Sequence, residues 1–442
     1  MKYLSGIDIS TLPPEESIKG KKILFLTDIF LPHFAPRLFS WVSYFVRLGA
    51  SCTVCCEDIS VNSRAGHGHV FTNVADPCAV YRFRLRKHYS RWESLSQAFF
   101  LAKDKRFFRL IKKHLNTADY DLIIASSYRT FPLYTAFLLS KLYHIPFLAD
   151  CRDVVEEYAR YSFLPGRSID RPIFYKRWAL HLLKGLFIRQ RTAILKKATA
   201  ITTVSPWHRA LLSSLSEGVP CYCLFNGYDS TLFYPSPVAT ERFTILYTGR
   251  LMSLQMRDPS LLFDALSDAA LEPIVGSGLL EVAWYVDDHS KALLTSLLQD
   301  YPDSLRHIQR FYPMVPFEQV PDILRRAGMI LLLNNDELRD GPRGMVSTKL
   351  FEAMAVGKPI LSIPGRSTIV SSILSDAGFG ESLVEKHEVM REIEHYFGYW
   401  KKNLYTCKEI DNKLLVEQFA RDEIASLCAR VAGSLLLAKK NE

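Results

Sequence analysis

The stretch 344–359, GMVSTKLFEAMAVGKP, combines a helix start with charged side chains at helical spacing. Ser347 and Thr348 precede an apolar periodic run, so either hydroxyl can cap a helix N-terminus. Lys349 and Glu352 are three residues apart and share one face of that helix. A helix N-terminus suits a phosphate group, and the carboxylate of Glu352 suits a diol. The alternative is a capped amphipathic helix with an ordinary surface Glu–Lys pair.

A second set of cations follows a predicted strand at Phe243–Thr248. Gly249 and Arg250 come directly after this strand, and Arg257 precedes the next predicted helix. Guanidinium groups bind phosphate oxygens in pairs. A small residue, an Arg, a short loop and a second Arg therefore form a candidate grip for a diphosphate.

Polar residues also follow predicted strands in the first half of the chain. They are Asp150, Arg152, Asp153, Thr203, Ser205, Asn226, Gly227 and Asp229. Each has a structural alternative: an internal salt bridge for Asp150 and Arg152, a helix cap for Ser205, and a turn for Asn226-Gly227.

The elements that must position these residues alternate between strand and helix. Short continuous apolar strands separated by helix-length segments indicate parallel sheets covered on both faces. The predicted strands are Lys22–Thr27, Ser51–Cys56, Asp121–Ala125, Pro146–Ala149, Ala198–Thr203, Val219–Leu224, Phe243–Thr248, Val282–Val286, Met329–Leu333 and Pro359–Ser362. The predicted helices are Leu38–Leu48, Tyr128–Tyr143, one from Ser205, Pro259–Ala269, His289–Leu298, Pro316–Ala327, Ser347–Ala355 and Thr368–Asp376.

The alternation is interrupted once, at residues 226–240, where Gly227, Pro235 and Pro237 indicate an interdomain linker. We therefore predict an α/β fold of two doubly wound, Rossmann-like domains facing across a cleft. The predicted domain boundaries are a lead at 1–20, a first Rossmann-like domain at 21–225, the linker at 226–240, a second Rossmann-like domain at 241–407 and a C-terminal helix at 408–442. We expect that helix to cross back to the first domain.

Taken together, these stretches resemble the retaining glycosyltransferases of the GT-B architecture, specifically the large family 4 group, from Lys22 to about Ile360. The matching landmarks are Pro32, Pro36 and Arg37 in the first loop, D-x-R-D at Asp150–Asp153, T-x-S at Thr203–Ser205, N-G-x-D at Asn226–Asp229, Y-x-G-R at Tyr247–Arg250 and K-x-x-E-x-x-A-x-G-x-P at Lys349–Pro359.

The resemblance implies transfer of a sugar, of the hexosyl type, from a nucleotide-sugar to an acceptor with retention, and with no metal or cofactor. It implies that 21–225 is an acceptor-side domain and that 241–407 is a nucleotide-sugar-binding domain. It also implies that Glu352 binds ribose hydroxyls, and that Arg250 and Arg257 lie at the donor diphosphate. The residues implied to be catalytic are Asp153, Arg250 and Glu352. The implied donor-binding set is Gly249, Arg250, Arg257, Ser347, Thr348, Lys349 and Glu352, and the acceptor-side set is Pro36, Arg37, Asp150, Arg152 and Asp153.

The sequence departs from the family pattern at three places. Gly344 replaces the first of two glutamates eight residues apart, Phe34-Ala35-Pro36 replaces a glycine pair, and Ser126-Ser127 replaces a histidine. Two alternatives therefore stay open: a non-catalytic GT-B partner subunit and a nucleotide-sugar epimerase.

Two weaker motifs have structural interpretations. Gly276-Ser-Gly278 lacks the third glycine and the following helix of a dinucleotide fingerprint. Asp287-Asp288 ends a predicted strand, and we interpret it as a helix cap rather than a metal site. Cys52 and Cys55 lie in an apolar run without a second Cys or His pair, which favours buried strand cysteines over a zinc or redox site.

Composition limits the class of protein. The 442 residues are 48% hydrophobic and 23% charged, which is typical of a globular protein and excludes a disordered or collagenous chain. The nine cysteines indicate a reduced, cytoplasmic protein. We find no signal peptide and no uncharged apolar stretch of about 18 residues.

The net charge of +9 favours anionic partners. The basic stretches are 82–113 and 176–197; the second contains Trp178, Leu182, Leu183, Leu186 and Phe187 among Lys184, Arg189 and Arg191. This pattern is typical of a helix on an anionic membrane surface, and the alternative is a helix packed on the sheet with its basic face in solvent. We expect a lipid-linked or surface-glycan acceptor of the cell envelope, attachment at the inner face of the membrane, and no nucleic acid, since no nucleic-acid-binding motif is present.

Overall fold

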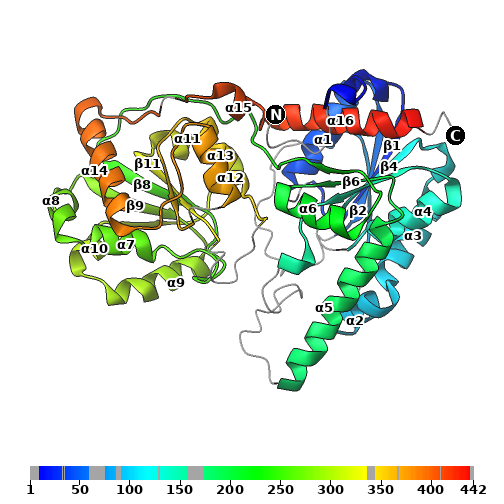
Figure 1. Ribbon diagram of the computed structural model, residues 1–442, viewed down its shortest axis with the longest axis horizontal. Helices are drawn as coiled ribbons and strands as arrows, with labels where there is room; N and C mark the ends of the chain where they lie inside the picture. Colours follow the sequence, from blue (N-terminus) through cyan, green and yellow to red (C-terminus); the bar gives the residue numbers. More distant parts are fainter. Residues whose placement is uncertain are drawn as a thin grey trace. The chain divides into compact units, whose positions relative to one another are not determined.

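The computed structural model describes residues 9–31, 33, 35–58, 75–85, 91–127, 130–157, 174–335, 344–365, 368–408 and 410–438. The chain forms two compact units (Figure 1). Unit 1 comprises Met1–Asn226 and Arg421–Glu442, and unit 2 comprises Gly227–Ala420.

Unit 1 is built on a seven-stranded sheet in which every paired strand is parallel. Its strands are β1 (Lys22–Thr27), β2 (Ser51–Glu57), β3 (Ala79–Phe83), β4 (Leu122–Ser127), β5 (Phe147–Cys151), β6 (Ala200–Thr203) and β7 (Cys221–Cys223), in the order β3-β2-β1-β4-β5-β6-β7. The strand order reverses between β1 and β4. The inner strands are buried almost throughout because helices cover both faces.

The helices of unit 1 are α1 (Pro36–Arg47), α2 (Arg91–Phe100), α3 (Ala102–His114), α4 (Leu133–Tyr143), α5 (Phe174–Leu195), α6 (Pro206–Leu215) and α16 (Arg421–Ala438). The short helix η2 (Glu15–Ile18) and α1 both pack against α16, which lies beside α1 in Figure 1. Cys52 and Cys55 are buried, unpaired side chains of β2, which confirms the prediction of strand cysteines.

Unit 2 contains a five-stranded parallel sheet. Its strands are β8 (Phe243–Thr248), β9 (Leu280–Tyr285), β10 (Gln309–Tyr312), β11 (Met329–Leu333) and β12 (Ile360–Ile363), in the order β10-β9-β8-β11-β12. Its helices are α7 (Ser260–Leu266), α8 (Glu272–Val275), α9 (Asp288–Leu297), α10 (Asp303–His307), α11 (Val320–Arg326), α12 (Thr348–Ala355), α13 (Ile369–Asp376), α14 (Lys386–Asn403) and α15 (Lys413–Glu417).

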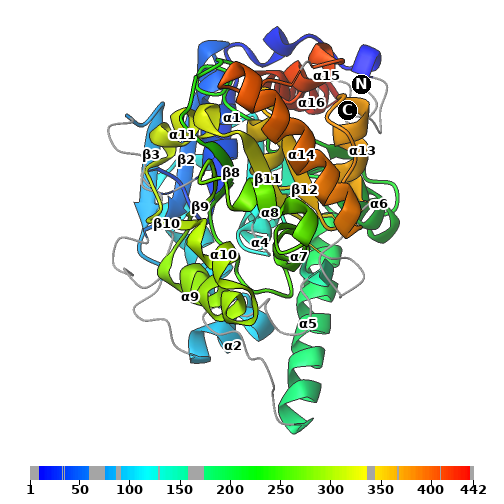
Figure 2. The ribbon, with the colours of Figure 1, turned by 90° about the vertical axis from the view of Figure 1, so that its left-hand side faces the viewer.

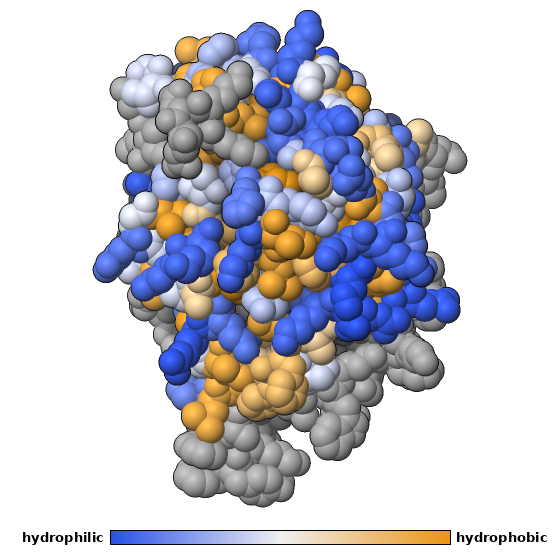
Figure 3. Space-filling view, turned by 90° about the vertical axis from the view of Figure 1, so that its right-hand side faces the viewer, coloured by the Kyte–Doolittle hydropathy of each residue, from blue (hydrophilic) through white to orange (hydrophobic). Residues whose placement is uncertain are grey.

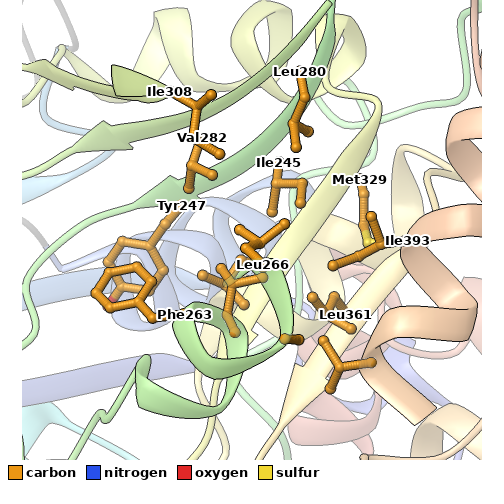
Figure 4. Packing of buried hydrophobic residues seen from close by; sticks show 14 of the residues in the cluster. Ile245, Tyr247, Phe263, Leu266, Leu280, Val282, Ile308, Met329, Leu361 and Ile393 are labelled. Carbon is orange, nitrogen blue, oxygen red and sulfur yellow. The ribbon is translucent and has the colours of Figure 1, made fainter. Parts of the chain in front are cut away.

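The core of unit 2 lies between the sheet and the helices α7 and α14, and α14 passes in front of the sheet in Figure 2. Alternate residues of β8, such as Ile245 and Tyr247, meet Phe263 and Leu266 of α7 and Ile393 of α14 (Figure 4). The intervening residues of the sheet face the other side, where α12 contacts β11.

Most of the predicted strands and helices are present, and the prediction of two parallel, doubly wound α/β sheets is confirmed. The prediction of one C-terminal helix is wrong: α15 and α16 are separated by residues 418–420. The predicted helix start at Tyr128, and the loop residues Pro32 and Phe34, lie outside the described residues. Of the helices described, none has the length and apolar character needed to cross a membrane.

Candidate active site

A pocket in unit 2 lies at the carboxyl ends of β11 and β12, next to the point where the strand order reverses between β8 and β11. Ligands of open parallel sheets bind at such reversal points. The pocket is lined by Arg257, Leu332, Leu333, Asn334, Asn335, Met345, Ser347, Leu350, Thr368, Ile369 and Val370.

Two helices begin at this pocket, each with a capping hydroxyl in its wall. The Ser347 Oγ accepts a hydrogen bond from the Lys349 backbone N–H at 3.3 Å, which caps α12. The Thr368 Oγ1 accepts one from the Ser371 backbone N–H at 3.1 Å, which caps α13. The pocket therefore collects the positive partial charges of two helix N-termini, and the guanidinium of Arg257 adds a full charge.

Asn334 and Asn335, which follow β11, line the pocket but were not predicted as site residues. The Asn334 Nδ2 donates to the Ser362 Oγ at 2.8 Å and to the Pro364 carbonyl at 3.1 Å, so its side chain is fixed. The Asn335 Oδ1 is buried and accepts no hydrogen bond from the described residues. Their position directly after a buried strand is a signal that sequence reasoning missed.

Beside the pocket, Lys349 packs against the backbone of Gly249. Its ammonium lies 4.5 Å from the centre of the Tyr247 ring and 3.4 Å from the Tyr247 hydroxyl. Gly249 has φ +100°, and a Cβ at this position would lie 2.6 Å from the Lys349 Nζ. Position 249 therefore needs glycine for two reasons: the backbone conformation and the place taken by the ammonium.

The surroundings of Lys349 disfavour its charged form. Burial and the nearby charge of Arg257 hold the pKa of the Lys349 amine well below its usual range, while the Glu352 carboxylate raises it. Glu352 follows Lys349 on α12 and is itself buried. A bound anion would offset the repulsion between Lys349 and Arg257 and would favour the charged form of Lys349.

The two arginines predicted at the diphosphate lie in different environments. Arg257 lines the pocket, and its Nη1 donates to the Arg250 carbonyl. The Arg250 Nε lies 3.2 Å from the Asp287 Oδ2. Asp287 also caps α9 by accepting from the Ser290 backbone N–H, which confirms the predicted cap. Of the predicted donor-site residues, the structure brings together Gly249, Arg257, Ser347, Lys349 and Glu352. The Arg250 side chain is directed to Asp287 instead. Thr348 is the first residue of α12.

In unit 1, Arg37 and Asp150 form an ion pair inside the molecule. The Arg37 Nη2 donates to the Asp150 Oδ1 at 2.8 Å, and the side chains are 5% and 0% exposed. Ser126 and Thr202 donate to the same carboxylate at 2.7 and 2.9 Å, and the Arg37 Nη1 donates to the Leu224 and Phe225 carbonyls at 2.8 Å. This network ties α1 to β4, β5 and β6, so its polar atoms are already paired.

The other acceptor-side residues lie at the carboxyl end of β5 and the start of α1. The Arg152 Nη2 donates to the Asp28 Oδ1 at 2.7 Å. Burial alone lowers the pKa of Arg152, but the carboxylates of Asp28, Asp150 and Asp153 outweigh burial, so the pKa of the guanidinium lies above its usual value. Asp153 is partly exposed, and Pro36 is the first residue of α1.

The basic stretch of α5 is less exposed than the sequence suggests. Arg191 is wholly buried in an ion pair with Glu156 at 2.5 Å, and the Lys184 Nζ donates to the Glu156 carbonyl. Arg191 therefore does not belong to a basic surface of α5, because Glu156, 35 residues away in the sequence, neutralises it. The side chain of Trp178 lies outside the described residues.

No protein-family model and no curated protein matches the sequence. Solved structures do match the fold. A sucrose-phosphate synthase from Thermosynechococcus elongatus has a TM-score of 0.63 at 15% identity, over 95% of this chain and 100% of that one. Alr3699/HepE of Anabaena, solved with UDP and glucose, has a TM-score of 0.60 at 14% identity, over 94% and 100%. A glycosyltransferase from Rickettsia africae has a TM-score of 0.52 at 12% identity, over 95% and 96%. The chain therefore has the α/β fold of the GT-B glycosyltransferases.

Proposed function

We propose that the protein is a glycosyltransferase that binds a nucleotide-sugar in the pocket of unit 2. The observation that carries this proposal is the convergence of Arg257, Lys349 and the capped N-terminus of α12 at the reversal point of the sheet. Two cations and a helix N-terminus suit the two phosphates of a nucleoside diphosphate better than they suit a neutral ligand.

The same groups give a route for transfer without a metal. When the bond between the sugar and the diphosphate breaks, negative charge develops on the leaving phosphate oxygens. Arg257 and Lys349 stabilise that charge because they are held in place before the reaction. Glu352, one turn further along α12, binds the ribose hydroxyls. Arg250 joins the diphosphate only if it leaves Asp287, so we assign it the weaker role.

For the reaction itself we propose hexosyl transfer with retention, with Asp153 of unit 1 at the reacting sugar. The proposed acceptor is a lipid-linked or surface glycan, and the proposed location is the inner face of the membrane. UDP-glucose is the first donor to test, because the Anabaena protein was solved in complex with it.

A thermal-shift screen of nucleotide-sugars tests the donor site. We expect UDP-glucose or a related donor to raise the melting temperature of the wild type and to have a smaller effect on Glu352→Ala. Glu394→Ala is the matched control, because Glu394 is an exposed glutamate on α14. An equal response of wild type and Glu352→Ala contradicts the role of Glu352.

The screen and a product analysis also separate the alternatives. No response to any nucleotide or nucleotide-sugar favours a non-catalytic subunit. Conversion of the donor to a different nucleotide-sugar without an acceptor favours an epimerase. The anomeric configuration of the product, measured by NMR, tests retention.

A further inference from the structure

Two phenylalanine side chains at the end of α2 are exposed to solvent in unit 1. Phe99 is 57% exposed and Phe100 is 67% exposed, and their ring centres are 6.4 Å apart. Leu182 on the neighbouring helix α5 is 53% exposed. Figure 3 shows the side of the molecule that carries unit 1, where apolar side chains gather toward the lower end and hydrophilic side chains flank them. Two large exposed rings this close together are typical of an interaction surface.

The end of α2 is held firmly by buried polar contacts beneath the rings. The Gln190 Nε2 of α5 donates to the Ala98 carbonyl at 2.8 Å. On the inner side, the Gln97 Nε2 donates to the Asp104 Oδ2 at 2.6 Å, and the Thr135 backbone N–H donates to the Asp104 Oδ1 at 3.0 Å. Helices α2, α3, α4 and α5 are thereby linked, and Phe99 and Phe100 are presented outward on a fixed support.

The helix that follows the rings is basic on its accessible surface. Five cations of α3 are exposed or partly exposed: Lys105, Arg106, Arg109, Lys112 and Lys113. Its one acidic residue, Asp104, is fully buried. On α5, Arg189 is exposed and directly precedes Gln190, the residue that contacts the end of α2. The rings end α2, and the first exposed cation of α3, Lys105, follows Phe100 by five residues on a helix that packs against α2.

We propose that this surface, formed by Phe99, Phe100 and Leu182 with the cations of α3 and Arg189, docks on an anionic lipid bilayer. Aromatic rings enter the interfacial region of a bilayer, and lysine and arginine bind its anionic headgroups. The exposed lysines of α3 favour a lipid surface over a protein partner, because lysine is depleted at protein–protein interfaces and is attracted to anionic headgroups. The docking surface deepens the proposed function, since it would bring the protein to a membrane-borne acceptor.

Vesicle sedimentation of the full-length protein tests the surface. We expect binding to vesicles of phosphatidylglycerol and phosphatidylcholine at low salt, weaker binding at high salt, and little binding to phosphatidylcholine alone. Phe99→Ser with Phe100→Ser should weaken partitioning at least about tenfold, since each ring loses apolar burial. Lys105→Gln with Arg109→Gln should weaken it about 30-fold, because each cation near an anionic bilayer contributes about fivefold.

Matched variants carry the same chemical changes elsewhere. Leu414→Ser with Leu437→Ser removes two exposed apolar side chains that are 72% and 45% exposed, and Lys401→Gln with Lys402→Gln removes two exposed cations of α14. These controls should bind vesicles as the wild type does.

Three outcomes would overturn the proposed surface: no binding to anionic vesicles at low salt, equal loss in the controls, or full binding by the phenylalanine variant. Sedimentation needs neither donor nor turnover. A protein that binds UDP-glucose but not vesicles refutes only the membrane surface, whereas one that binds vesicles but no nucleotide refutes only the proposed function.

Discussion

Replacement of Gly249 by alanine tests whether this glycine positions Lys349 for the donor diphosphate. The new Cβ would lie 2.6 Å from the Lys349 Nζ and 2.9 Å from its Cε, so the ammonium must leave the Tyr247 ring. A charge-assisted hydrogen bond contributes about 1.5–3 kcal/mol. We therefore expect the affinity for UDP-glucose to fall about 10- to 150-fold, measured by isothermal titration calorimetry.

The same substitution also strains the backbone, and this effect needs its own control. An alanine at φ +100° costs about 1–2 kcal/mol in stability. Gly278→Ala provides the match, because Gly278 has φ +70° in the same unit and no atom within 4 Å of an added Cβ. We expect Gly278→Ala to lose similar stability and to bind UDP-glucose as the wild type does.

A double-mutant cycle decides whether Gly249 acts through Lys349. If it does, Gly249→Ala with Lys349→Met should bind no more weakly than Lys349→Met alone, since the displaced group is already gone. Wild-type affinity in Gly249→Ala, or additive losses in the double variant, would refute the positioning argument.

Three further predictions concern charges that the structure buries. The affinity for UDP-glucose should fall as the pH rises through the lowered pKa of Lys349, because only the charged ammonium pairs with phosphate. In calorimetric titrations, Lys349→Arg should abolish this dependence of affinity on pH. Arg37→Met should destabilise unit 1 by about 3–5 kcal/mol in urea unfolding, because Asp150 is left unpaired and buried. Arg37→Met with Asp150→Asn should recover part of this loss. An unchanged urea midpoint for the single variant would contradict the prediction. Burial raises the pKa of Asp104 to about 6, so the folded state binds more protons than the unfolded state between pH 3.8 and 6. The unfolding free energy of the wild type, relative to that of Asp104→Asn, should therefore increase by up to about 1.4 kcal/mol for each pH unit as the pH falls across that range. Equal pH profiles of stability for the two proteins would count against this assignment.

Local signals in the sequence were sufficient for the buried strands and for several caps. Lys22–Thr27, Phe243–Thr248 and Met329–Leu333 are strands with the predicted bounds, because a strand covered on both faces needs a continuous apolar run. The capping residues Ser347 and Asp287 were among the predicted caps, because a cap is a local interaction with the backbone of its own helix.

Edge and surface elements lacked such signals. Strands β3 and β10 lie at the outer edges of their sheets and are largely exposed, so their sequences have no continuous apolar run. Helices α2 and α3 lie almost wholly within the basic stretch 82–113, where the sequence patterns did not predict a helix.

The roles of the charged residues were decided by contacts between distant parts of the chain. A motif places Arg250 and Lys349 near a diphosphate, but Asp287 engages the first and Tyr247 with Gly249 holds the second. Arg37 and Asp150 are 113 residues apart in sequence. Residue type and spacing specify which groups are able to ionise and where helices begin; the partner of each charge depends on the packing of remote strands, and only the tertiary structure determines it.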